Sequence, residues 1–155
     1  MGIEAIRAFF SPRRSQQERD GSRPDPVTVA ACALLLEIAH ADEVFLPEER
    51  ERIARHIRDE MHVSEEQLQE VFRLAEEERR ESVDLYQFTR LLSEHLSRED
   101  RLKLVEAIWG VVYSDGVLTA VEGQLARRIA ELLGFQHPEV QQIKEAVAAR
   151  RAVSS

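Results

Sequence analysis

Two stretches of the chain, IAHADEVFLPEE (residues 38–49) and VVYSDGVLTAVE (residues 111–122), align without a gap at an offset of 73 residues. In both, an apolar segment ends in a small residue and is followed by Asp, a turn residue and Val. A Glu comes seven positions after the Asp in each stretch, where the next helix is expected to begin. A repeat at a fixed offset is typical of a duplicated structural unit. The two stretches therefore predict two similar helical hairpins, each with an acidic turn.

From residue 27 onward, apolar residues recur every three or four positions, which is typical of amphipathic helices. Residues that favour helix starts lie between these stripes, namely Pro47, Ser64 with Gln67, Asp84, Ser97, Thr119 with Glu122, and Pro138. Stop signals follow at Gly116 and Gly134. Because the connections are short, neighbouring helices should pack antiparallel around one core. The sequence predicts an all-α protein, a compact bundle of about seven helices with two pseudo-repeated helical hairpins.

Composition supports this fold class and excludes several functions. The 155 residues are 43% hydrophobic and 32% charged, with only 6 Gly and 5 Pro, which suits one helical domain rather than a β-sandwich. The net charge is −8, and residues 27–155 hold 16 basic against 25 acidic residues. Nucleic acid is not an expected partner, because phosphate binding requires clustered basic residues. No apolar run could span a bilayer and no secretory signal is present, so we expect a cytoplasmic protein.

The first 26 residues differ from the rest of the chain. Residues 11–26 combine three Pro and one Gly with polar and charged residues, which indicates a flexible linker. Two interpretations of residues 3–10 are open: an amphipathic anchor for a partner or for a membrane surface, or a fraying tail. The expected organisation is a short amphipathic segment and linker, a helical domain and a tail, at residues 1–26, 27–151 and 152–155.

Four carboxylates belong to the repeated turns: Asp42, Glu49, Asp115 and Glu122. If the hairpins pack with pseudo-twofold symmetry, these groups converge, and a hard divalent cation would offset their mutual repulsion. A second interpretation is also open, because Glu in a first helical turn and Asp in a turn stabilise helix ends by capping and through the helix dipole. An EF-hand does not fit, because its twelfth position, which must be Glu, is Ile53 in one loop and Ala126 in the other.

No residue pattern indicates catalysis or a small-molecule substrate, so we expect a protein that is not an enzyme. A hydrolase with two cations in the carboxylate cluster lacks an accompanying His or Lys arrangement. His40 precedes Asp42 by two residues and is expected to border the same site. The single cysteine, Cys32, lies in an Ala/Leu run and is predicted to be a small buried hydrophobic residue. Trp109 is predicted to lie in the core.

Three segments together resemble the TerB-like family of tellurite-resistance and stress proteins: Val112–Glu122, Tyr86–Leu92 and Ala107–Trp109. A similar domain precedes the transmembrane-linked DnaJ co-chaperones of bacteria. The resemblance covers about Val27 to Val147. It implies an all-helical domain with pseudo-repeated halves, in a bacterial cytoplasmic protein that is sometimes recruited to the inner membrane. It also implies metal chelation at the matching acidic positions, which are Asp42, Glu49, Asp115 and Glu122.

The chain departs from the family pattern at Glu43, where Gly is usual, and at Ala120 and Val121, where Pro and Glu are expected. These departures bear on the metal interpretation rather than on the fold. The resulting functional hypothesis is a non-enzymatic TerB-like module that docks protein partners in a stress-response or envelope-associated assembly linked to tellurite resistance. The alternative is a divalent-metal-binding or metal-sensing protein that uses the duplicated acidic site.

Overall fold

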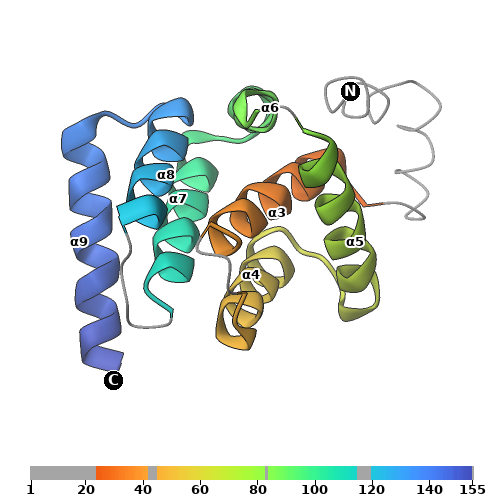
Figure 1. Cartoon of the computed structure of the whole chain (residues 1–155), viewed down its shortest axis with the longest axis horizontal. Helices are drawn as coiled ribbons and strands as arrows, with labels where there is room; N and C mark the ends of the chain where they lie inside the picture. Colours follow the sequence, from red (N-terminus) through yellow and green to blue (C-terminus); the bar gives the residue numbers. More distant parts are fainter. Residues whose placement is uncertain (1–23, 42–44, 83, 115–119, 155) are drawn as a thin grey trace.

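The computed structural model describes residues 24–41, 45–82, 84–114 and 120–154, and every element in these ranges is an α-helix (Figure 1). The helices are α3 (Pro26–Ala39), α4 (Pro47–Glu60), α5 (Glu65–Glu81), α6 (Tyr86–His95), α7 (Arg98–Val112), α8 (Ala120–Leu132) and α9 (His137–Ser154). The prediction of an all-α bundle of about seven helices is confirmed. Most of the predicted N-terminal segment lies outside the described residues, which begin at residue 24.

Helix α3 forms the centre of the bundle and contacts α4, α5, α6 and α7 (Figure 1). Nearly all of its side chains are buried, including the consecutive residues Leu34, Leu35 and Leu36. A helix that is hydrophobic on all sides is stable only when other elements enclose it. Cys32 lies fully buried on this helix, and burial raises the pKa of its thiol far above the usual range. The prediction that Cys32 is a buried hydrophobic residue is confirmed.

The duplication extends further than the sequence comparison predicted. Helices α7 and α8 correspond to α3 and α4 at the predicted offset, and α9 corresponds to α5 at an offset that is shorter by one residue. Among the described residues, positive φ occurs at His62 (57°) and Gly134 (99°), which occupy equivalent places before α5 and α9. The buried residues of the two helices also correspond: Leu68, Val71 and Ala75 match Val140, Ile143 and Val147. The described helices therefore form two three-helix repeats joined by α6.

Gly134 ends the second helix of the second repeat, as predicted. Its N–H donates to the carbonyl of Glu131 at 3.0 Å, and the N–H of Phe135 donates to the carbonyl of Ala130 at 3.1 Å. This pair of bonds is a Schellman motif, which requires a left-handed residue after the helix. A Cβ at Gly134 would lie 2.9 Å from Nη1 of Arg101, which is closer than side-chain carbons normally approach.

Replacing Gly134 with alanine should lower the free energy of unfolding by about 1–2 kcal/mol, because an L side chain disfavours the left-handed conformation. Gly110→Ala is the matched control, because Gly110 lies inside α7 and its added Cβ would make an ordinary 3.6 Å contact with Nη1 of Arg52. That change should stabilise the protein by about 0.5–1 kcal/mol, because alanine is the better helix former. Urea denaturation measures both effects, and a destabilised Gly110→Ala protein would contradict this account of α7.

Several predicted helix starts are confirmed. Pro47 is the first residue of α4, and Ser64 and Ser97 accept hydrogen bonds at their Oγ atoms from the N–H three residues later. The prediction for Asp84 is wrong by one residue, because Leu85 holds the N-cap position of α6. Oδ1 of Asp84 instead accepts from the N–H of Tyr86 at 2.8 Å, so a short acidic side chain still binds the start of the helix. The predicted signals Gly116 and Thr119 lie outside the described residues.

Candidate functional site

Glu49 is the third residue of α4, and only 1% of its surface is exposed. Its Oε1 accepts a hydrogen bond from the N–H of Leu46 at 3.0 Å. This bond is the glutamate half of a capping box, and the other half cannot form because a leucine side chain has no acceptor. The neighbouring Glu48 is exposed, although it lies in the same helical turn. Glu49 therefore combines a capping bond with the burial of a carboxylate.

Glu122 occupies the equivalent position in the second repeat, as the third residue of α8, and is fully buried. Burying a carboxylate is costly unless hydrogen bonds or opposite charges compensate for the lost water. In each repeat, a buried glutamate therefore lies at the start of the second helix. Sequence alignment identified the equivalence of Glu49 and Glu122, whereas their burial emerges only from the fold.

Both glutamates lie at the same end of the bundle, beside the C-terminal end of α7. Helices α4 and α7 are antiparallel, because Arg52 reaches Gly110 near the end of α7 while Glu60 pairs with Lys103 near its start at 3.3 Å. Helix α8 also runs antiparallel to α7, because Nη1 of Arg101 donates to the carbonyl of Leu133 at 2.7 Å. The starts of α4 and α8 therefore flank one end of α7.

The other two predicted ligands, Asp42 and Asp115, lie outside the described residues. Within the ranges that the structure describes, no three His, Cys, Asp or Glu side chains form a group able to hold a metal ion. The four-carboxylate site thus stays a prediction. The described part of it consists of Glu49 and Glu122.

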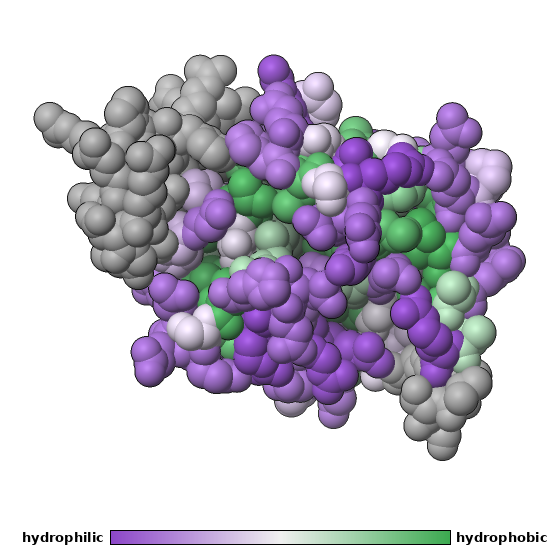
Figure 2. Space-filling model, turned by 180° about the vertical axis from the view of Figure 1, so that it is seen from behind, coloured by the Kyte–Doolittle hydropathy of each residue, from purple (hydrophilic) through white to green (hydrophobic). Residues whose placement is uncertain are grey.

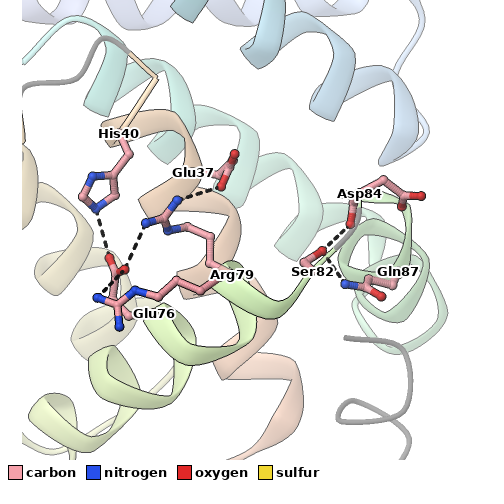
Figure 3. Close-up of polar contacts among 8 residues, drawn as sticks. Glu37, His40, Glu76, Arg79, Ser82, Asp84 and Gln87 are labelled. Carbon is pink, nitrogen blue, oxygen red and sulfur yellow. Dashed lines mark hydrogen bonds and ion pairs between the residues drawn. The ribbon is translucent and has the colours of Figure 1, made fainter. Parts of the chain in front are cut away.

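His40 takes part in a network that joins α3 to α5, and Figure 3 shows His40 and Arg79 both directed at Glu76. Nε2 of His40 lies 3.0 Å from Oε1 of Glu76. Arg79 binds Oε2 of Glu76 at 3.1 Å and Oε2 of Glu37 at 3.2 Å. The ring of Phe45, which follows the first acidic turn, contacts the ring of His40 edge-on at 4.8 Å. His40 therefore links the end of α3 to α5, a role that its position in the sequence does not reveal.

Because of Glu76, the stability of the protein should fall at low pH. Burial raises the pKa of this carboxyl, but hydrogen bonds from Arg79 and His40 outweigh burial, so its pKa lies below the usual value. The stabilisation is fully present above the unfolded-state pKa and is lost as the pH falls through the lower folded-state pKa. Glu76→Gln should therefore flatten the fall in melting temperature below about pH 4.5. Glu77→Gln, at the exposed neighbouring position, is the control and should leave the fall in melting temperature at low pH unchanged.

A cleft of about 440 Å³ lies between α4 of the first repeat and α7 and α9 of the second. Its lining residues are Arg52, Arg55, His56, Asp59, Glu60, Lys103, Glu106, Ala107, Gly110, Val147 and Arg150. Two ion pairs lie within it, Lys103 with Glu60 at 3.3 Å and Arg150 with Glu106 at 2.7 Å. The volume falls in the range of protein ligand sites. Sequence reasoning missed the cleft, because these residues look like the solvated faces of three separate helices.

His56 lies at one side of the cleft and also lines a smaller adjoining hollow with Met61, Leu96 and Leu104. Burial lowers the pKa of His56, and this effect exceeds the opposite influence of the carboxylates of Glu60 and Asp100. The imidazole is therefore held in its neutral form near neutral pH.

No helix in the described ranges is long and apolar enough to span a membrane.

Among known proteins, the family model described as tellurite resistance protein TerB matches residues 28–145. No curated protein and no solved structure gives a significant match. The match covers most of the chain, from the first turn of α3 to the middle of α9, so the resemblance found in the sequence is confirmed. The chain belongs to the TerB family of tellurite resistance proteins.

Proposed function

We propose that this chain is a non-enzymatic stress-response module that docks protein partners, close to the inner membrane, and contributes to tellurite resistance. The observation that carries the proposal is the cleft between α4, α7 and α9. It lies across the junction of the two repeats, so a bound partner would contact both halves of the domain. Family membership supports the link to tellurite resistance.

The surface of the domain favours recognition by charge. Hydrophilic side chains dominate the face seen in Figure 2, with hydrophobic surface showing between them. Among the described residues, Tyr86 and Val121 are the exposed large hydrophobic side chains, and they belong to different helices. A partner that binds such a surface gains specificity from charged and polar contacts more than from apolar burial. The cleft supplies guanidinium and carboxylate groups for such contacts.

Site-specific photo-cross-linking in cells of the native host tests the docking role. A photoreactive benzoylphenylalanine replaces Asp59, an exposed residue of the cleft, and in a control protein it replaces Gln124, an exposed residue of α8. The proposal expects one defined adduct from position 59, identified by mass spectrometry, and no such adduct from position 124. The same adduct should disappear when Arg55→Glu is added, and cells carrying that variant should survive tellurite less well.

Arg128→Glu is the matched background for this experiment. Arg55 and Arg128 are both exposed, and neither makes an ion pair with another described residue. Both substitutions change the charge by the same amount, so only loss of the adduct in Arg55→Glu alone supports docking in the cleft. Equal adduct yields in the two backgrounds, together with unchanged tellurite survival, would refute the proposal.

A divalent-metal-binding or metal-sensing role is the second candidate. The observation that favours it is the burial of Glu49 and Glu122 at equivalent positions beside one end of α7. With Asp42 and Asp115 from the same two turns, they would supply the carboxylate oxygens that Ca²⁺, Mg²⁺ and Mn²⁺ prefer. Binding would then tighten the contact between the two repeats.

A further inference from the structure

We infer that the occupant of the cleft is an acidic segment of the partner protein, and that one of its carboxylates binds Arg55 on the side of the cleft that faces Arg52. This inference rests on the proposed docking role and adds to it the chemistry of the partner.

The cleft is electrostatically polarised along its length. Gly110, close to the end of α7, lies beside Arg52, whereas Glu60 and Lys103 lie at the opposite end. Asp59 is adjacent to Glu60, so acidic groups gather where α4 ends. Arg52 lies where α4 begins and α7 ends, and Arg55 lies one turn further along α4, between Arg52 and Asp59. A bound segment would therefore place its negative side chains toward Gly110.

The acidic groups of the cleft already have cationic neighbours. Glu60 pairs with Lys103, Glu106 pairs with Arg150 at 2.7 Å, and Asp59 pairs with Arg58 at 3.5 Å. The guanidinium of Arg55 has no ion pair among the residues that the structure describes. The cleft thus offers a cation to an incoming carboxylate, and guanidinium groups bind carboxylates through paired hydrogen bonds.

The floor of the cleft favours a polypeptide over a simple polyanion. Ala107, Gly110 and Val147 are small or apolar, so they leave room for the aliphatic side chains that a peptide carries between its acidic residues. A nucleic acid would bring a phosphate at every step against Asp59, Glu60 and Glu106. The chain's own residues 1–26 hold five basic and four acidic residues, so their charge has the wrong sign for this cleft.

Two fluorescein-labelled peptides that differ only in charge test the inference with the full chain. One repeats Glu-Glu-Ala-Leu, and the other repeats Lys-Lys-Ala-Leu. Fluorescence anisotropy should detect binding of the Glu peptide, and this binding should weaken as salt screens the charges. The dissociation constant should rise by about tenfold or more in Arg55→Glu, as for loss of a charge-assisted contact, and should stay unchanged in Arg128→Glu. Arg55→Gln should give an intermediate value.

Circular dichroism of each variant confirms that the helices are retained before its binding is compared. Absence of Glu-peptide binding, equal binding of the Lys peptide, or equal losses in Arg55→Glu and Arg128→Glu would overturn the inference. So would an Arg55-dependent dimer in sedimentation experiments, because a second copy of the chain would then be the occupant.

Failure of the inference and failure of the docking proposal give different results. If the cellular adduct at position 59 requires Arg55 but the Glu peptide does not bind, docking stands and the acidic partner is wrong. If the Glu peptide binds through Arg55 but no Arg55-dependent adduct forms in cells, the charge preference is genuine and the docking role is wrong.

Discussion

Replacing Trp109 with alanine should lower the free energy of unfolding by about 3–5 kcal/mol, because the change removes a large buried side chain and leaves a cavity. The prediction that Trp109 lies in the core is confirmed, since its side chain is fully buried on α7. Its ring lies 6.1 Å from the ring of Tyr113 and 5.5 Å from Nζ of Lys144 on α9. Loss of the indole would therefore loosen the contact between α7 and α9.

Tyr86→Ala provides the control for this measurement, because 57% of the Tyr86 surface is exposed at the start of α6. That change should alter stability by no more than about 0.5 kcal/mol. Trp109→Phe should lie between the two, since it retains an aromatic ring in the same place. Urea denaturation followed by circular dichroism measures all three variants. Near-normal stability of Trp109→Ala would mean that α7 and α9 do not enclose the indole in solution.

If the four carboxylates bind metal, adding a divalent cation should raise the free energy of unfolding, and this is the second-largest effect that we expect. A cation that binds only the folded protein contributes about 2.7 kcal/mol at a hundredfold excess over its dissociation constant. Thermal melting with added Ca²⁺, Mg²⁺, Mn²⁺ or Zn²⁺ measures this gain. Asp115→Asn should abolish it and should raise the stability of the metal-free protein, because it relieves repulsion between carboxylates.

Glu49→Gln and Glu48→Gln form a matched pair for the same experiment. Both remove one negative charge from the first turn of α4, but only Glu49 is buried and belongs to the predicted site. Glutamine keeps an oxygen that can accept from the N–H of Leu46, so the capping bond is retained. The metal hypothesis requires the metal-induced gain to fall in Glu49→Gln and to persist in Glu48→Gln. Metal-independent melting with no heat of binding in calorimetry would leave these residues as helix caps.

The sequence by itself determined the fold class and most helix starts, because helix formation depends on residues that are close along the chain, and its motifs indicated the family. The spacing of apolar residues reports which face of a helix is buried, and Ser64, Ser97 and Gly134 act on the nearest turn of backbone. The gap-free alignment of residues 38–49 with residues 111–122 also showed that Glu49 corresponds to Glu122. The helices α5 and α9 were predicted, but their correspondence as the third helix of each repeat was not, because a one-residue shift and few identities hide it.

Only the tertiary structure decided which distant residues meet. His40 and Glu76 are 36 positions apart, and Arg150 is 44 positions from its partner Glu106. On each separate helix these residues resemble an ordinary solvated face, so no local pattern distinguishes them from other exposed charges. The cleft arises because the antiparallel packing of α4 on α7, beside α9, brings three such faces together. The packing of the helices decides which charged side chains come together in the cleft, whereas helix formation depends on residues that are neighbours along the chain.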